Sequence, residues 1–165
     1  MADKRGADAD GEGRRPPRYL DVADRIWPLT QRLMGAHTFL YRRTGGRIGQ
    51  TAPGVRGKML LLDHVGARSG KRRTLPLLYV EDGADVVIVA SKGGFPKNPA
   101  WYHNLKANPE TAVQIGSERR PVRARDAGPD EYDRLWQKAV ASYGGYRDYK
   151  ARTDRKIPLV VLQPR

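Results

Sequence analysis

Cations and glycines are concentrated in one short segment, residues 66–71 with the sequence Gly-Ala-Arg-Ser-Gly-Lys, and Arg72 and Arg73 follow it directly. Glycines let backbone N–H groups approach an anion closely, and guanidinium groups bind phosphate oxygens in pairs. The segment is one residue shorter than a P-loop, and Arg72 stands where Ser or Thr would bind magnesium, so a P-loop is not indicated. Two interpretations stay open: a strand-to-strand turn that binds a phosphate, or a solvated hairpin that is merely basic.

A second candidate loop, residues 91–99, opens directly after the β-branched run at 86–89 and contains Ser91, Lys92 and two adjacent glycines. The end of a buried strand is a common place for ligand contacts, although a surface turn can have the same composition. Trp101 and a Tyr-His-Asn sequence come next, and large rings with polar groups line pockets well. Their closeness in sequence favours a pocket over a plain turn.

Three tyrosines, Tyr143, Tyr146 and Tyr149, recur every third residue. On a helix they would lie along roughly one face, and such a stripe most often packs into a core. The glycine pair at 144–145 and Lys150 argue against deep burial, so a segment that covers a pocket is the alternative interpretation.

Several classes of site lack the residues they need. The sequence contains no cysteine, which rules out disulfides, thiolate nucleophiles and Cys-ligated metals and makes a reducing cytoplasm the simplest location. His37, His64 and His103 are scattered, so we expect no metal site. The Gly-x-Ser-x-Gly motif of hydrolases and the Gly-x-Gly-x-x-Gly motif of dinucleotide-binding folds are both absent.

Of the net charge of +13, +12 lies on residues 19–165, because residues 1–18 carry a net charge of only +1. Such a surface attracts a polyanion: nucleic acid, an anionic membrane, or a phosphorylated and carboxylated cofactor. No apolar run is long enough to span a membrane or to form the core of a signal peptide.

The elements that must position these residues follow from periodicity. Residues 1–18 predict a disordered tail, and residues 19–165 a single domain whose N-terminal helices occupy 19–43 and end at Gly45-Gly46. Helices are also predicted near 99–105 and from Pro129 to the glycines at 144–145, and strands at 59–62, 74–80, 86–89, 113–115, 122–124 and 157–162. Asp82-Gly83 is a hairpin signal, and Pro76 requires its strand to be an edge or bulged there. Consecutive hairpins with helices at both margins predict a small antiparallel barrel in an α+β chain.

Four separated motifs, in the same order and spacing, closely resemble the deazaflavin-dependent nitroreductase and quinone reductase family. They are Val65–Gly70 with Arg73–Leu77, Val89–Gly94, Asn98–Pro109 and the closing segment Ile157–Leu162. The similarity runs from about Tyr19 to the C-terminus. It implies a split β-barrel like the FMN-binding split barrels, with flanking helices, and reduced coenzyme F420, an 8-hydroxy-5-deazaflavin, as hydride donor.

The resemblance also implies the binding residues. The turn that begins at Arg68 would cradle the phosphate, while the Ser-Lys-Gly loop and the tryptophan would contact the deazaflavin ring. The residues expected to bind the cofactor are Arg68, Ser69, Gly70, Arg73, Thr74, Pro76, Leu77, Ala90, Ser91, Lys92, Gly93 and Trp101. Two positions depart from the family: Ala67 replaces a common basic residue, and Leu78 replaces an aromatic residue of some relatives.

The expected reaction is hydride transfer to an electron-poor acceptor such as a quinone, an enone or a nitroaromatic compound. By the same resemblance, Tyr143, Tyr146 and Tyr149 border the acceptor pocket, and together with Ser91 they are the expected catalytic residues. They would orient the acceptor or donate a proton to it. The alternatives are a nucleic-acid-binding module, or the same barrel with FMN or haem; on the leading interpretation no nucleic acid is expected.

The N-terminal helices raise a question of location. Arg25 and Arg32, with Trp27, Leu29 and Phe39, could form an interfacial surface that meets membrane quinone at the inner face of the cell membrane. Packing of these helices against the barrel is the alternative. We expect a cytoplasmic monomer with at most peripheral membrane contact.

Overall fold

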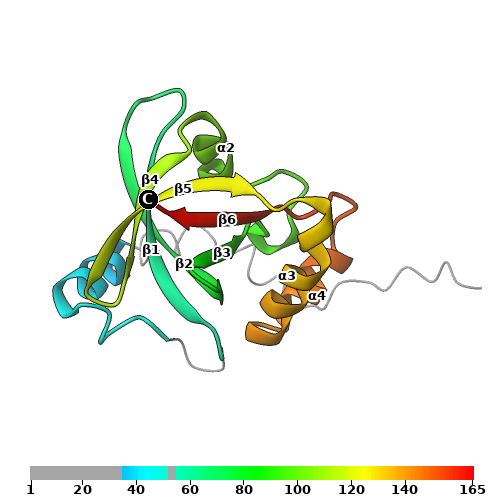
Figure 1. Ribbon diagram of the computed structural model, residues 1–165, viewed down its shortest axis with the longest axis horizontal. Helices are drawn as coiled ribbons and strands as arrows, with labels where there is room; N and C mark the ends of the chain where they lie inside the picture. The colour runs from blue at the N-terminus through cyan, green and yellow to red at the C-terminus, as the bar shows by residue number, and fades with distance from the viewer. Residues whose placement is uncertain (1–34, 52–54) are drawn as a thin grey trace, which may run out of the picture.

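Six antiparallel strands close into a barrel in the order β1-β2-β3-β6-β5-β4 (Figure 1). The computed structural model describes residues 35–51 and 55–165. The strands are β1 (Lys58–Val65), β2 (Arg72–Asp82), β3 (Asp85–Val89), β4 (Glu110–Ile115), β5 (Glu118–Asp126) and β6 (Leu159–Pro164). This confirms the predicted α+β class and the antiparallel barrel.

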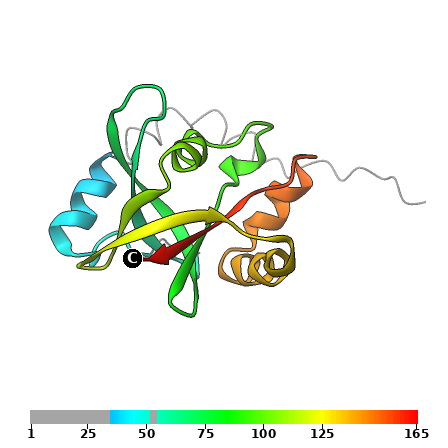
Figure 2. The same cartoon turned by 45° about the horizontal axis from the view of Figure 1, so that its top comes forward.

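Helices surround the barrel. They are a helix described over residues 35–44, the 3-10 turn η1 (Lys92–Gly94), α2 (Ala100–Ala107), α3 (Pro129–Ser142) and α4 (Gly145–Ala151). Figure 2 shows α3 and α4 together on one side of the barrel and the 35–44 helix on the opposite side. The predicted tail and the expectations for Arg25, Trp27, Leu29 and Arg32 lie outside the described residues.

The 35–44 helix is fixed to the barrel by Tyr41, which is fully buried. Its phenol donates a hydrogen bond to the carbonyl of Met59 at 2.9 Å and accepts one from the amide of Gly116 at 3.0 Å. The helix ends at Gly45 and Gly46, both in the left-handed region, as the sequence predicted. One side chain therefore joins the helix to β1 and to the β4–β5 turn.

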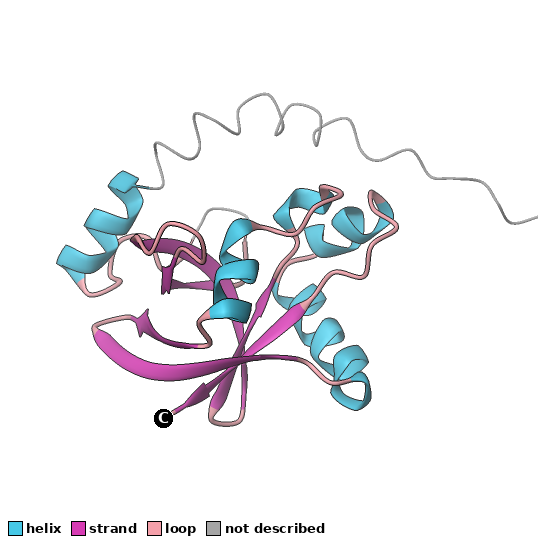
Figure 3. Ribbon diagram, turned by 90° about the horizontal axis from the view of Figure 1, so that it is seen from above, coloured by secondary structure: helices cyan, strands magenta, loops and turns pink. Residues whose placement is uncertain are grey.

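Strand alternation separates two apolar clusters. Inward-facing residues of all six strands fill the barrel, and Trp101 and Leu105 of α2 pack into the same cluster. Outward-facing residues of β3 and β6 pack against α3 and α4 through Leu135, Trp136 and Tyr146. The first cluster fills the barrel interior, and the second holds α3 and α4 to its outer face. Figure 3 shows the helices arranged around the strands.

Two strand pairings are shorter than the strands themselves, which leaves open seams. The β1–β4 pairing covers only Leu61 with Gln114 and Leu62 with Val113. The β2–β3 ladder covers only residues 79–82 of β2. Pro76 pairs with Leu61 of β1 but has no partner in β3, so it lies at a local edge as predicted, without interrupting the β1–β2 register.

The β2–β3 hairpin is tied to α3. Asp82, at the end of β2, forms ion pairs with Arg134 and Lys138, the latter at 2.8 Å. These contacts lower the pKa of the Asp82 carboxyl, because both cations hydrogen-bond its charged form. At the start of α3, Glu131 accepts a hydrogen bond from the amide of Gly128 at 2.8 Å, which caps the helix.

Candidate functional site

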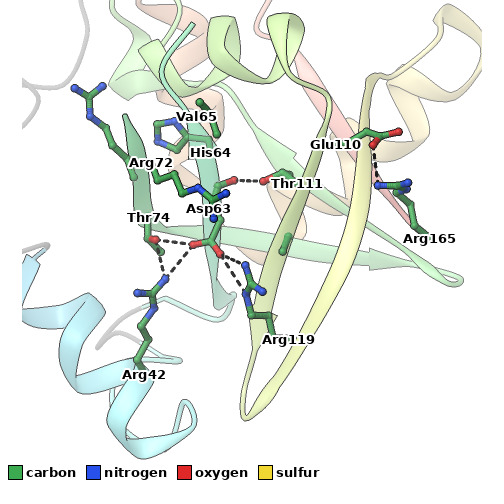
Figure 4. A pocket seen from close by; sticks show the side chains of 12 residues that line it. Arg42, Asp63, His64, Val65, Arg72, Thr74, Glu110, Thr111, Arg119 and Arg165 are labelled. Atoms are coloured by element: carbon green, nitrogen blue, oxygen red, sulfur yellow. Dashed lines mark hydrogen bonds and ion pairs between the residues drawn. The ribbon is translucent and has the colours of Figure 1, made fainter. Parts of the chain in front are cut away.

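An open hollow of about 680 Å³ occupies the seam between β1 and β4 (Figure 4). Asp63 lies at its centre and forms ion pairs with Arg42 at 3.0 Å and Arg119 at 2.9 Å. The Thr74 hydroxyl also hydrogen-bonds Asp63, and it accepts a hydrogen bond from Arg42 at 2.8 Å. Arg72, Arg73 and Thr74 connect this hollow to the β1–β2 turn, but none of the residues from 91 to 149 that were predicted to be functional lines it.

The β1–β2 turn (residues 66–71) is a folded loop with its cations free. The amide of Gly70 donates to the carbonyl of Gly66 at 2.8 Å, and the amide of Gly66 donates to Lys71 at 2.9 Å. Gly70 is left-handed, and a side chain there would meet nothing within 4 Å. The exposed side chains Arg68, Lys71, Arg72 and Arg73 form no ion pair with any carboxylate in the described residues. Unpaired cations around an open backbone fit an anionic group.

Two residues that the sequence analysis missed hold this turn in place. Asn104 of α2 accepts a hydrogen bond from the amide of Ala67 at 2.9 Å and donates one to Nδ1 of His64 at 2.9 Å. His64 and Asn104 are both buried. Burial lowers the pKa of His64, and the nearby charge of Arg73 lowers it further. The only signal in the sequence is the position of Asn104 inside the Trp-Tyr-His-Asn run.

The Ser91 loop (residues 91–98) contains three consecutive left-handed residues. The φ angles of Lys92, Gly93 and Gly94 are +47°, +63° and +77°. A Cβ on Gly94 would lie 2.6 Å from the carbonyl oxygen of Tyr149, so only glycine fits against α4. Ser91 is 9% exposed. The amide N–H groups of Lys92 and Gly93 donate no hydrogen bond to a described residue, and they are available to an acceptor.

Arg155, also missed in the sequence, contacts this loop at both ends. Its guanidinium donates to the backbone carbonyl of Ser91 at 2.7 Å and to that of Phe95 at 2.8 Å. Further hydrogen bonds reach the carbonyl of Ala90 and the side-chain oxygen of Asn98. No motif marks Arg155, because it is one of many arginines and lies 57 to 65 residues from its partners.

The three tyrosines form one aromatic cluster, although they do not share one helical face. Tyr143 follows the end of α3 in an extended conformation, and the other two lie on α4. Their ring centroids are 5.2 to 6.2 Å apart, and the hydroxyls of Tyr143 and Tyr149 lie 3.2 Å apart. The expectation of shallow burial is wrong at Tyr146, which is 6% exposed, because its ring packs on Trp136. Burial raises the pKa of Tyr146 well above its ordinary value.

The remaining predicted residues lie between these two loops or inside the barrel. Trp101 is 6% exposed and belongs to the interior cluster, as do Leu77 and Ala90. Pro76 is buried on β2. The edge of β2 from Arg72 to Leu78 has no partner in β3, so it runs unpaired from the cationic turn towards the level of the Ser91 loop.

The arrangement fits an elongated ligand with an anionic end and a flat polar ring. The turn supplies free cations, and the Ser91 loop supplies two free N–H groups and the Lys92 ammonium. Within the described residues, no helix is long and apolar enough to cross a membrane, and no three His, Asp or Glu side chains gather as metal ligands would.

Comparison with known proteins gives concordant matches. Residues 33–164 match the family described as F420H(2)-dependent quinone reductase. An F420H(2)-dependent quinone reductase of Mycobacterium tuberculosis is 45% identical over 136 residues, covering 81% of this chain and 91% of the relative. A solved structure of an F420-H2 dependent reductase is 42% identical, with a TM-score of 0.60, and the match covers 64% of this chain and 93% of that one. Another solved structure, described as a domain-swapped dimer, is 36% identical with a TM-score of 0.62, over 86% and 99% of the two chains.

Proposed function

Because the chain belongs to the family of F420H(2)-dependent quinone reductases, it is an oxidoreductase that uses coenzyme F420, and we propose that its two glycine-containing loops hold that coenzyme. The observation that carries the proposal is the unpaired edge of β2, with free cations at one end and the Ser91 loop beyond the other. FMN and haem, the alternative cofactors of a split barrel, are not the cofactor of this family.

The β1–β2 turn would bind the anionic part of the coenzyme. Arg68 and Arg73 would hold phosphate oxygens, with Ser69 and the open backbone at Gly70 beside them, and Thr74 would border the site from β2. Lys71 and Arg72 would compensate for the missing basic residue at position 67. The free charges of the turn support this assignment, since Arg42 and Arg119 of the neighbouring hollow pair with Asp63, and Arg165 pairs with Glu110.

The Ser91 loop would bind the deazaflavin ring. The free N–H groups of Lys92 and Gly93 would stabilise negative charge on the pyrimidine side of that ring. Pro76, Leu77, Ala90 and Trp101 would form the apolar support of the site, the last three from within the barrel cluster. When bound, the reduced deazaflavin supplies a hydride to a quinone, which also takes up a proton to become a quinol.

The acceptor would lie against the tyrosine cluster. Tyr143 and Tyr149 are half-buried and share a hydrogen bond, so one phenol can donate a proton while the other orients it. Tyr146 would support both rings from below, and the Ser91 hydroxyl would face the acceptor from the loop. A flat electron-poor compound, whether quinone, enone or nitroaromatic, suits this aromatic wall.

The direct test follows reoxidation of reduced F420 spectroscopically with a soluble quinone. The wild-type protein should turn over, and Arg68→Ala with Arg73→Ala should weaken coenzyme binding by about tenfold or more for each lost charged contact. Arg123→Ala removes one positive charge, as each of these two substitutions does, but from an exposed site on β5, and it serves as the control. Loss of affinity in the control as large as in the double variant would refute the site; no binding by wild type would refute the function.

Membrane contact and assembly are separate proposals. Phe39, Leu40 and Ile48 are exposed on or beside the 35–44 helix, which supports peripheral contact with a quinone-containing membrane. Replacing all three by Ser should abolish co-sedimentation with anionic liposomes without loss of folding, since none of them is buried.

The relative that is a domain-swapped dimer argues against the monomer expected from the sequence, and we propose that sedimentation velocity will detect a dimer.

Nucleic-acid binding is the alternative explanation of the large net positive charge. It predicts affinity for DNA or RNA that falls steeply with salt. A coenzyme site would account for the free cations in a member of this family, so we propose that such binding is absent at physiological salt.

A further inference from the structure

Arg155 makes four hydrogen bonds to the segment that carries the Ser91 loop. Nε donates to the carbonyl of Phe95 at 2.8 Å, and Nη1 donates to the side-chain oxygen of Asn98 at 2.6 Å. Nη2 donates to the carbonyls of Ala90 at 3.2 Å and Ser91 at 2.7 Å. All three nitrogens of the planar guanidinium are therefore engaged by a single chain segment.

The oxygen atoms that accept hydrogen bonds from Arg155 lie on both sides of the strained part of the loop. Ala90 and Ser91 precede Lys92, and Phe95 and Asn98 follow Gly94, so the guanidinium joins the two ends across the three left-handed residues. A left-handed lysine is a costly conformation that persists only where the surroundings enforce it. The Arg155 guanidinium, called the clamp below, holds these residues in that conformation from outside the loop.

No carboxylate in the described residues forms an ion pair with Arg155, although the side chain is partly buried. Burial lowers the pKa of the guanidinium, which marks an environment unfavourable to charge. A partly buried cation without a counter-ion is a poor way to gain stability, because desolvation is not offset by ion pairing. Its four directed hydrogen bonds indicate that Arg155 serves to fix the conformation of the Ser91 loop.

We propose that Arg155 is a positioning residue that holds the Ser91 loop in its coenzyme-binding shape before the coenzyme arrives. The clamp fixes the direction of the free N–H groups of Lys92 and Gly93, and it orients Ser91 through its backbone. Preorganisation of this kind improves affinity because the loop loses less freedom on binding. The inference rests on the proposed function of the loop.

The test compares Arg155→Lys, which keeps the charge but loses the planar fork, with Arg123→Lys as an exposed control. Without coenzyme, amide hydrogen exchange of Gly94 and Phe95, whose N–H groups donate to the carbonyls of Ser91 and Lys92, should accelerate in Arg155→Lys, while the strands keep their protection. The dissociation constant for F420 should rise about tenfold or more, because the loosened loop must be ordered on binding. Millimolar guanidinium should partly restore the affinity of Arg155→Ala, and sodium chloride at the same ionic strength should not.

Unchanged exchange of the Gly94 and Phe95 amides in Arg155→Lys would overturn the clamp, whatever the activity. Faster loop exchange with unchanged coenzyme affinity would overturn the role in positioning. If wild type itself failed to bind F420, the proposed function would fall, while the exchange measurement would still report on the clamp. Should the Arg155 variants not fold, Asn98→Ala removes one acceptor only and should loosen the same residues to a smaller extent.

Discussion

The side-chain oxygen of Asn104, on α2, lies 2.9 Å from the backbone amide of Ala67 in the β1–β2 turn and accepts its hydrogen bond. The Asn104 amide nitrogen donates to His64 at the same time. Because a backbone N–H can only donate, the orientation of the Asn104 amide is fixed, and so is the tautomer of His64, whose Nδ1 must accept. A motif on one helix thus positions the cationic turn that precedes it by more than thirty residues.

Asn104→Leu removes both hydrogen bonds at similar volume. We expect a loss of stability of about 1–3 kcal/mol, because buried His64 keeps an acceptor without a donor. Affinity for F420 should fall about tenfold as the turn loses its support. Urea denaturation and fluorescence titration measure the two effects. Asn108→Leu, at an exposed position just after α2, is the control, and an equal loss of affinity there would contradict the prediction.

His64 should make coenzyme binding pH-dependent. Its pKa in the folded protein is below the ordinary value of 6.5, so the unfolded chain takes up the proton first. Stability from neutral His64 is therefore fully present above pH 6.5 and declines as the pH falls below it. Protonation also turns Nδ1 into a donor that opposes the Asn104 amide nitrogen. Binding of F420 should weaken as the pH falls below 6.5.

Asn104→Asp tests that explanation, because a carboxylate accepts hydrogen bonds from both Ala67 and protonated His64. The variant should bind less tightly at pH 7.5, since it adds a negative charge near the anion site. Its affinity should nevertheless no longer fall as the pH drops below 6.5. A wild-type decline that persists unchanged in Asn104→Asp would assign the pH dependence to another group.

The hydroxyl pair of Tyr143 and Tyr149 should act in proton transfer to the acceptor. Replacing either by Phe should lower kcat for quinone reduction about a hundredfold, with the dissociation constant of F420 unchanged. Because the two hydroxyls share one hydrogen bond, the double variant should be little worse than the poorer single variant. Stopped-flow kinetics in H₂O and D₂O would measure this. Quinone reduction unaffected by Phe at 143, 146 and 149 would remove the acceptor pocket from this cluster.

Tyr146 should matter most for stability. Its ring fills the space between the barrel and α3, so Tyr146→Ala should lower the free energy of unfolding by about 3–5 kcal/mol. Tyr149→Ala, at a half-buried ring, should cost less than half as much. Urea denaturation provides the comparison, and equal losses at the two positions would mean that the packing around Tyr146 is looser than its burial implies.

The sequence predicted the local elements well, because their signals are local. Asp82-Gly83 marked the β2–β3 turn, Pro129 the start of α3, and Pro76 a strand edge, and each lies where its own backbone chemistry requires. The prediction from the tyrosine spacing was partly wrong, because that spacing is also a purely local signal. A spacing of three suggested one helix face, whereas a break after Ser142 put Tyr143 on the end of one helix and Tyr146 inside the core.

By itself the sequence determined the antiparallel barrel, the family and the two loops with glycines and cations. Hydrophobic periodicity, turn residues and motif spacing are local signals that can be read directly from the order of the residues. Only the tertiary structure decided what holds those loops. Asn104 reaches the turn, and Arg155 reaches the Ser91 loop, across dozens of residues, through hydrogen bonds that exist only once the barrel has brought their elements together. The positioning of the candidate site therefore rests on long-range contacts, which neither periodicity nor motif can reveal.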